Sequence, residues 1–422
     1  MSCRKMREMK DSGIPWIGEI PEGWTIELIG NQVKEVDNPN SNGKEKNALQ
    51  FKMGSIISKS QGNSKYNPET LEEYNIVDKG VIMLNGLNLS FDFISQRVGL
   101  VRERGVITST YLAVKPTDNI DSEYLTYLFK AYDNCKAFHS MGKGLRQTLS
   151  YGELRKYLLI YPSLAEQRRI AEFLDRKCAE VDEMIALQEQ IIEELKAYKQ
   201  SVITEAVTKG LNPAAPMRDS GIEWIGQIPE HWTTIRIKYL LGERKERSEY
   251  GKEEPLSMSQ KYGLIPTKEM DTIPNMASSF EGAKIVYPED LVFNKLKAHL
   301  GVFATSKYNG LVSPDYAVYF GLGRALMPFM EYMFKTPQYI SEFRKTATGV
   351  GSGLTRLYTS DLFSMPFPLP SIEEQGVIVT YIKEKCADID SLIQTKQSKI
   401  DSLREYKKSI IYEYVTGKRE VE

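Results

Sequence analysis

Two long segments of the chain repeat apolar residues at the heptad spacing typical of helices that pack against one another. The first segment, 163–208, carries Val181, Met184, Ile185, Ile191, Ile192, Leu195, Tyr198 and Val202. The second segment, 371–416, carries Ile389, Leu392, Ile393, Ile400, Leu403, Tyr406 and Ile410. The pattern predicts two long helices, and the simplest arrangement packs them on each other as a coiled coil.

The starts of the two predicted helices have the same local sequence. A proline precedes each, followed by the pattern S-x-x-E, in which serine and glutamate satisfy free amides at a helix start. Ser163 and Ser371 are 208 positions apart (371 − 163), and the same offset relates Tyr198 to Tyr406. The two helical segments are therefore copies of one another.

An aromatic signature repeats at the same offset. Residues 11–24 read D-S-G-I-P-W-I-G-E-I-P-E-G-W, and residues 219–232 read D-S-G-I-E-W-I-G-Q-I-P-E-H-W. All four tryptophans of the chain lie in these two segments, which favours a packing motif with aromatic anchors. A period of roughly 200 residues is too long for a solenoid unit. The repeat therefore implies two copies of a whole domain, each followed by a helix.

The region between signature and helix has a mixed hydrophobic pattern in both copies. Apolar runs at 76–84 and 285–293, interrupted by turn residues, predict strands. Segments 122–130 and 327–335 predict a short helix in each copy. The first parts of the two copies match each other poorly in sequence. This is expected if the two halves have the same function but act on different targets.

The overall composition is that of an ordinary globular protein, with 41% hydrophobic and 26% charged residues. No apolar run approaches the roughly 20 residues that span a bilayer, and Met1–Glu8 lacks the apolar core of a signal peptide. The cysteines, Cys3, Cys135, Cys178 and Cys386, fall at no metal-ligand spacing. These features predict a cytoplasmic protein with no membrane segment.

The charge balance does not by itself indicate a nucleic-acid-binding protein. The formal net charge is −1 and the pI is about 6.4, whereas nucleic-acid-binding domains are often clearly basic. Any DNA binding must therefore depend on local patches or on a partner that contacts phosphates.

A glycine-rich turn lies upstream of each long helix. The turn at 141–148 contains Lys143 and Arg146, and the turn at 348–356 contains Arg356. Glycines let backbone amides approach an anion closely, so each turn is a candidate phosphate contact. A plain flexible loop is the alternative interpretation.

Polar and basic side chains follow a predicted strand in each copy. They are Asn85, Asn88 and Arg97 in the first copy and Asn294, Lys295, Lys297 and His299 in the second. Asn and Arg can read adenine and guanine edges through paired hydrogen bonds, and Lys and His can contact bases or phosphates. We predict that these residues bind DNA; surface charge without a partner is the alternative.

The chain lacks recognisable catalytic motifs. We find no H-E-x-x-H, no phosphate-binding P-loop, no paired-cysteine metal site and no Asn/Asp-Pro-Pro-aromatic segment of adenine methyltransferases. A self-contained DNA-modifying enzyme would need a cofactor or metal site that the sequence does not display.

Together these motifs resemble the specificity subunits of Type I restriction-modification enzymes. The resemblance covers nearly the whole chain. It depends on the signature at 11–24 and 219–232, and on P-S-L-A-E-Q at 162–167 and P-S-I-E-E-Q at 370–375. It also depends on the duplicated order of variable domain and helix.

The resemblance implies a non-catalytic DNA-binding subunit with several partners. In that family each variable domain recognises one half of a split double-stranded DNA sequence, and the long helices set the spacing and bind two methyltransferase subunits. S-adenosylmethionine is then expected on the methyltransferases, and ATP and magnesium on separate translocase-nuclease subunits. The expected partner-binding residues at the helix starts are Glu166, Gln167, Glu374 and Gln375.

The predicted architecture is α+β, a tandem duplication of a mixed α/β target recognition domain followed by a long helix. The recognition domains are placed at 1–162 and 213–370, and the helical elements at 163–212 and 371–422. The two helices are expected to pack as an antiparallel coiled coil with pseudo-twofold symmetry. The alternative function is a coiled-coil interaction scaffold without DNA recognition.

Overall fold

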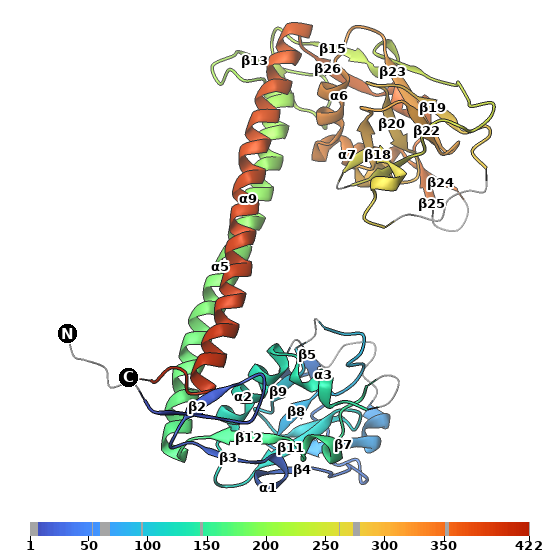
Figure 1. Cartoon of the computed structure of the whole chain (residues 1–422). Coiled ribbons are helices and arrows are strands. Elements are labelled where there is room, and N and C mark those ends of the chain that lie inside the picture. The colour runs from blue at the N-terminus through green and yellow to red at the C-terminus, as the bar shows by residue number, and fades with distance from the viewer. Residues whose placement is uncertain are drawn as a thin grey trace. The chain divides into compact units, whose positions relative to one another are not determined.

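The computed structural model of the protein describes residues 7–52, 54–59, 68–93, 96–143, 147–260, 262–272, 279–350 and 354–421. The chain divides into two compact units (Figure 1). Unit 1 comprises Met1–Glu189 and Ser398–Glu422, and unit 2 comprises Gln190–Gln397. Each unit contains one copy of the mixed domain and part of each long helix.

Both long helices form where the heptad pattern predicts them. Helix α5 spans Leu164–Lys209 and helix α9 spans Ile372–Val415. The serine before each helix accepts a hydrogen bond from the amide three residues later, at 3.4 Å for Ser163 and 3.2 Å for Ser371. The serine half of each predicted capping box is therefore present.

Within each unit, α5 and α9 run antiparallel and side by side (Figure 1). In unit 1, Lys407 Nζ from late in α9 lies 2.7 Å and 2.6 Å from the two carboxylate oxygens of Asp182, early in α5. In unit 2 the order is reversed, because Lys199 from late in α5 meets Asp390 from early in α9. The buried seam includes Val181, Ile192, Val202, Ile389, Ile400 and Ile410. The predicted antiparallel coiled coil is confirmed.

Four of the apolar heptad residues lie outside this seam. The side chains of Met184 and Leu392 are each 50% exposed, and those of Tyr198 and Tyr406 are 58% and 51% exposed. Each stands one residue before a seam position, and a helix turns about 100° per residue, which moves the side chain out of the seam. The sequence pattern alone did not distinguish these exposed positions from the seam positions that follow them.

The domain of unit 1 is built on a four-stranded antiparallel sheet in the order β4-β11-β8-β9. Helix α2 packs on β9 and β11 and buries most of its apolar residues. The strands are β1 (Met9–Asp11), β2 (Glu19–Pro21), β3 (Thr25–Leu28), β4 (Val33–Glu35), β5 (Leu49–Lys52), β6 (Ser55–Ser58), β7 (Tyr74–Val77), β8 (Ile82–Leu84), β9 (Val98–Leu100), β10 (Gly105–Thr108), β11 (Leu112–Pro116) and β12 (Leu158–Tyr161). The helices are α1 (Ile29–Gln32), η1 (Pro68–Glu73), α2 (Ser122–Asn134), α3 (Ala137–Met141) and α4 (Tyr151–Leu154).

The domain of unit 2 repeats this sheet in the order β16-β23-β20-β21, again antiparallel. The strands are β13 (Met217–Asp219), β14 (Gln227–Pro229), β15 (Thr233–Arg236), β16 (Leu241–Glu243), β17 (Leu256–Ser259), β18 (Gly263–Pro266), β19 (Lys284–Val286), β20 (Leu291–Asn294), β21 (Phe303–Thr305), β22 (Gly310–Val312), β23 (Tyr316–Gly321), β24 (Thr348–Val350), β25 (Leu354–Arg356) and β26 (Pro366–Leu369). The helices are η2 (Ile237–Tyr239), η3 (Thr267–Glu269), η4 (Ala298–Leu300), α6 (Met327–Phe334), α7 (Pro337–Thr346) and α8 (Thr359–Ser364). The strands and short helices predicted at 76–84, 122–130, 285–293 and 327–335 all lie within these elements or overlap them.

The tryptophan signatures attach the long helices to the domains. Trp24 and Trp232 are 3% and 1% exposed, so the predicted packing role is confirmed. In unit 1, Gly417 ends α9 with φ +70°, and a Cβ at this position would lie 2.9 Å from the Trp24 ring. Glycine is therefore required there by both the left-handed turn and the close approach of the indole.

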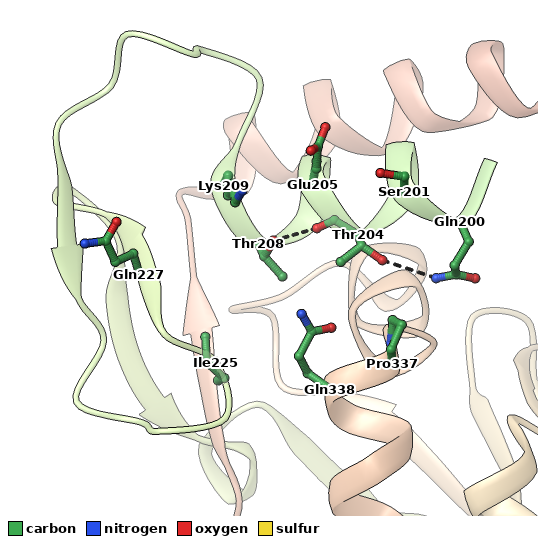
Figure 2. A pocket seen from close by; sticks show the side chains of 10 residues that line it. All are labelled: Gln200, Ser201, Thr204, Glu205, Thr208, Lys209, Ile225, Gln227, Pro337 and Gln338. Carbon is green, nitrogen blue, oxygen red and sulfur yellow. Dashed lines mark hydrogen bonds between the residues drawn. The ribbon is translucent and has the colours of Figure 1, made fainter. Parts of the chain in front are cut away.

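A difference between the units appears where each signature meets a helix end. In unit 1, the Tyr412 hydroxyl donates hydrogen bonds to the carbonyls of Trp16 (3.0 Å) and Ile17 (3.2 Å). The residue 208 positions earlier, in unit 2, is Thr204. Beside it lies an open cavity of about 420 Å³, which Ile225, the counterpart of Ile17, also lines (Figure 2). The smaller threonine side chain leaves this space unfilled.

Candidate nucleic-acid interface

In unit 1 the loop that follows β8 contacts the turn that precedes α4. In unit 2 the loop that follows β20 contacts the turn that precedes α8. The Leu149 amide donates to the Gly86 carbonyl at 2.9 Å in unit 1, and the Leu357 amide donates to the Lys295 carbonyl at 3.1 Å in unit 2. We call this pair of segments the loop–turn junction. It comprises the described residues 85–93, 96–97, 142–143 and 147–149 in unit 1, and 294–302, 348–350 and 354–357 in unit 2. The junction brings together the two groups of predicted DNA contacts, which are distant in the sequence.

An asparagine begins the loop of each junction in the same way. The Asn85 Oδ1 atom accepts a hydrogen bond from the Leu87 amide, and Asn294 Oδ1 accepts one from the Leu296 amide, both at 3.2 Å. Such side-chain turns fix the direction in which the chain leaves a strand. Both asparagines therefore shape the loop, in addition to any contact that their amide nitrogens make.

The buried Arg97 side chain holds the unit 1 loop through hydrogen bonds to its backbone. The side chain is only 1% exposed. Its guanidinium donates to the carbonyls of Asn85 (2.9 Å), Leu87 (2.7 Å) and Asp92 (2.6 Å). The Arg97 side chain therefore holds the loop through three carbonyls, while its Nε atom is buried without a hydrogen-bond partner. Its assignment as a DNA-binding residue stays a prediction.

A buried carboxylate stands behind this arginine. Asp133 of α2 is 5% exposed and accepts a hydrogen bond from the Arg97 amide at 2.9 Å. Burial raises the pKa of Asp133 above its usual range, and the hydrogen bond from the Arg97 amide offsets part of that rise. Asp133 thus ties the loop to α2.

The glycine-rich turn of unit 1 adds a solvent-exposed cation. The Lys143 side chain is 71% exposed, and its Nζ atom lies 3.0 Å from the Glu153 carboxylate. Hydrogen bonds from Lys143 and Lys156 lower the pKa of Glu153. An ion pair this exposed is weak and can exchange its carboxylate for a phosphate. Arg146, also predicted here, lies outside the described residues.

The turn of unit 1 is also tied to the tip of the loop. Asn88 is exposed with φ +53°, and the Leu89 amide next to it donates to the Gln147 carbonyl at 3.1 Å. Asparagine tolerates this left-handed conformation better than most residues. The loop and the turn of unit 1 therefore form one surface.

The junction of unit 2, at the same place in the fold, carries a different set of polar groups. Lys297 is exposed, and Lys295 and His299 are half-buried. The Arg356 guanidinium, 25% exposed, lies 3.4 Å from Asp315 at the base of the β24–β25 hairpin. These cations, which the sequence analysis assigned to two separate motifs, belong to one junction.

The comparisons with known proteins identify this arrangement. The model of the type I restriction modification DNA specificity domain matches residues 99–197. The type I restriction enzyme MjaVIII specificity subunit of Methanocaldococcus jannaschii is 21% identical over 433 residues, covering 94% of this chain and 93% of the relative. The chain is thus similar to type I specificity subunits along nearly its whole length, and these comparisons support its recognition as one.

Solved structures have the same fold as this chain. A structure described as the basis of complex assembly and conformational transition of the type I R-M system has a TM-score of 0.68 at 13% identity, covering 95% of this chain and 99% of that chain. The HsdS subunit of Thermoanaerobacter tengcongensis has a TM-score of 0.53 at 14% identity, covering 95% and 98%. The tandem α+β fold with a helical pair is therefore the fold of this family.

The helix-start glutamines of this chain make structural contacts. Gln167 and Gln375 are both 0% exposed. The Gln375 side chain accepts from the Leu326 amide at 2.7 Å and donates to the Pro370 carbonyl at 3.0 Å. Gln167 makes the matching bonds with the Asp121 amide and the Pro162 carbonyl. Each glutamine anchors its helix start to the neighbouring domain, and the assignment of both as partner-binding residues stays a prediction.

The helix-start glutamates are engaged within the chain but partly accessible. The Glu374 carboxylate accepts from Trp232 Nε1 and from His231 Nε2, each at 3.0 Å. The Glu166 carboxylate pairs with Arg7 at 2.9 Å. Their side chains are 28% and 18% exposed, so a partner could reach only their edges. Their assignment as partner-binding residues stays a prediction.

Three apolar residues at the junctions escaped the sequence analysis. Phe91, Phe93 and Leu300 are 74%, 55% and 50% exposed. The sequence offers no local motif that distinguishes an exposed apolar residue from a buried one beside a strand. The available signal was the repeat itself, because Phe91 and Leu300 both stand six positions after the asparagine that begins the loop.

The Asn, Lys, Arg and His side chains at the junctions are of the types that contact a polyanion. Across the described ranges, no three His, Cys, Asp or Glu side chains are grouped so that they could hold a metal ion. In the same part of the chain, no helix is both long enough and apolar enough to cross a bilayer.

Proposed function

We propose that this specificity subunit recognises a bipartite DNA target, with unit 1 reading one half and unit 2 the other. Sequence-specific DNA recognition is the activity of the family, and the division of the target is the added step. The loop–turn junction, present at the same place in both units with different side chains, supports the proposal most strongly. Two modules with a junction at the same place but with different side chains on it are suited to contacting DNA alike while reading different bases.

The proposal assigns direct readout to the polar groups of each junction, which are exposed or half-buried. In unit 1 these are Asn88 and Lys143, with Asn85 at the loop start and Arg146 retained from the sequence prediction. In unit 2 they are Asn294, Lys295, Lys297, His299 and Arg356. Alanine at Arg356 should weaken methylation of the cognate DNA, while Arg97 should act through the loop that it supports.

Partner subunits complete the activity in this proposal. The chain directs two methyltransferase subunits and the restriction translocase-nuclease subunits to its target. S-adenosylmethionine would be held by the methyltransferases, and ATP and magnesium by the restriction subunits. A net charge of −1 leaves much of the phosphate contact to these partners. A cytoplasmic location stays a prediction.

One flank of the helical pair is suited to a protein partner. We define the apolar flank as Met184, Leu187 and Tyr406 of unit 1, all at least half exposed. Met184 and Leu187 are three residues apart in α5, so they lie on one helix face. The other flank carries the ion pair of Glu189 with Arg404. Exposed apolar stripes of this kind mark protein interfaces, and we assign this flank to the methyltransferases.

A test of the apolar flank compares the two sides of the helical pair. Replacing Met184 and Tyr406 by glutamate should abolish copurification with the methyltransferase. Replacing Glu189 and Arg404 by glutamine is the control and should leave copurification intact. Equal binding by both double variants would contradict the assignment of the flank.

A map of methylated adenine in the host genome tests the function as a whole. Deleting the gene should abolish methylation at one split motif and leave other motifs unchanged. Restoring the gene should restore that motif. Identical maps with and without the gene, in a host that expresses it, would favour the scaffold alternative, particularly if the chain still copurified with a methyltransferase.

A further inference from the structure

Each loop–turn junction presents one large apolar side chain to solvent at an equivalent position. Phe91 is 74% exposed and Leu300 is 50% exposed. Both stand six residues after the asparagine that begins the loop, Asn85 or Asn294. The two loops have different lengths and sequences, so the recurrence of an exposed apolar residue at this position is a shared property of the two junctions.

The unit 1 loop holds its phenylalanine on a fixed backbone. The buried Arg97 guanidinium binds three carbonyls of the loop, including that of Asp92 next to Phe91. The Asp92 carbonyl also lies 3.1 Å from His139 Nε2. The Phe93 ring stacks on the His139 ring, with centroids 4.7 Å apart. The loop is therefore pre-organised on both sides of Phe91, and the ring is held in water rather than folded into the core.

The unit 2 loop fixes its leucine by different contacts. Leu300 ends the short helix η4, where its amide donates to the Lys297 carbonyl at 3.0 Å. Its own carbonyl accepts from Gln260 Nε2 at 2.9 Å. Gly301 follows with φ +74°, a left-handed conformation that turns the chain away directly after Leu300. Two unrelated sets of contacts thus produce the same exposure.

The surroundings of both residues favour DNA over protein as the partner. In unit 1 the neighbouring groups are His139 and Lys136, whose Nζ donates to the Phe93 carbonyl, and the adjacent Asp92 carboxylate lies 3.7 Å from the Arg97 guanidinium. In unit 2 the flanking residues include Lys297 and His299. Cores of protein interfaces are depleted of lysine, whereas exposed Phe and Leu side chains near cations are typical of wedges that enter DNA between base steps.

We infer that Phe91 and Leu300 are apolar wedges that enter the base stack, one in each half of the DNA target. The inference rests on the proposed function. Each side chain partly unstacks one base step, and the junction around it supplies the polar and phosphate contacts. Phe91 and Leu300 are therefore further DNA-binding residues, distinct from the polar groups predicted from sequence.

The test uses the complex of the full chain with its methyltransferase, on the split target found by the methylation map. Phe91→Ala and Leu300→Ala should each weaken DNA binding by about tenfold or more, the scale of lost base stacking. Phe91→Leu should recover most of the affinity, because leucine is itself a wedge residue. Leu28→Ala in unit 1 and Tyr239→Ala in unit 2, exposed apolar residues of other elements, are the matched controls.

Base unstacking is a second readout, and it would not change if Phe91 and Leu300 only stabilised the fold. The probe is 2-aminopurine, placed at each position of the target except the methylated adenines. Wild-type complex should raise its fluorescence at one step in each half. Phe91→Ala should abolish the rise in one half only, and Leu300→Ala in the other half only.

Each possible outcome has a distinct meaning. A wild-type complex that binds no split target would overturn the proposed function and this inference with it. A wild-type complex that binds the target, together with alanine variants of equal affinity and unchanged fluorescence, would overturn the inference alone. Loss of the methyltransferase from the alanine variants, with thermal midpoints unchanged, would assign these side chains to a protein interface and overturn it as well.

Discussion

The Lys199 ammonium lies 2.7 Å from both carboxylate oxygens of Asp390. The same contact recurs in unit 1 between Lys407 and Asp182, and each residue of that pair is 208 positions from its counterpart. The aspartate comes from the early part of one helix and the lysine from the late part of the other. A duplicated sequence folded as an antiparallel pair produces this contact twice, once in each unit.

A charge-reversal cycle tests whether this ion pair specifies the antiparallel register. Lys199→Asp should lower the free energy of unfolding by about 1 kcal/mol, because it places a carboxylate beside Asp390. Asp390→Lys alone should have a similar effect, and the double variant should recover most of the loss. Urea unfolding measures all four proteins.

The result of this cycle depends on the coupling free energy between Lys199 and Asp390. A partly exposed pair contributes about 0.2–1 kcal/mol. Additive effects of the two reversals would show that the pair does not set the register. The same cycle at Asp182 and Lys407 provides an independent repeat.

Filling the cavity of unit 2 should stabilise the protein. Thr204→Tyr recreates the residue that unit 1 has as Tyr412, in a space of about 420 Å³. We expect a gain of about 0.5–2 kcal/mol, the usual range for cavity filling. The reverse change, Tyr412→Thr, should lose about 2–4 kcal/mol through lost packing and the loss of the hydroxyl hydrogen bond that the Trp16 and Ile17 carbonyls share. Calorimetric midpoints that fall for both variants would contradict the equivalence of the sites.

Replacing a helix-start glutamine should destabilise the junction of helix and domain. Gln375→Leu keeps the volume of the side chain but leaves the buried Leu326 amide and Pro370 carbonyl without their partner. An unsatisfied buried group costs about 1–3 kcal/mol, and thermal unfolding should show a loss of at least that size. Gln394→Leu, on an exposed face of α9, is the control and should change stability by less than about 0.5 kcal/mol. Equal effects at the two positions would refute the anchoring role.

Asp133 should make stability depend on pH in an identifiable direction. Burial raises its pKa above the usual 3.8, so the folded protein binds the proton more tightly than the unfolded chain does. Between 3.8 and the raised pKa, the folded state carries more protons, and this carboxyl makes the free energy of unfolding fall as pH rises. Asp133→Asn removes that contribution while keeping an acceptor for the Arg97 amide.

The measurement for Asp133 is a difference between two proteins. The free energy of unfolding of Asp133→Asn minus that of wild type should rise with pH across this window and then level off. Asp118→Asn, at an exposed position, is the control. A difference that is constant from pH 3.5 upward, on the order of experimental error, would contradict the proton linkage.

The candidate site was partly predictable because some of its signals are local. Lys143, Lys295 and Arg356 follow recognisable strand ends and glycine-rich turns, and the structure gathers each set at a junction. Arg97 shows the limit of this reasoning. As a basic residue near a strand end it matched the pattern of a DNA contact, yet its three carbonyl partners are supplied by a loop that folds over it.

The sequence by itself determined the duplication, the two long helices, the capped starts and the family, because these depend on repeats, periodicity and motifs that need no third dimension. Only the tertiary structure decided which side chains remain accessible. Gln167 and Gln375 became anchors, and Met184 and Tyr198 left the seam. Phe91 and Leu300 were exposed where apolar residues are usually buried. Burial is set by contacts between segments far apart in the chain, and local pattern carries no record of those contacts.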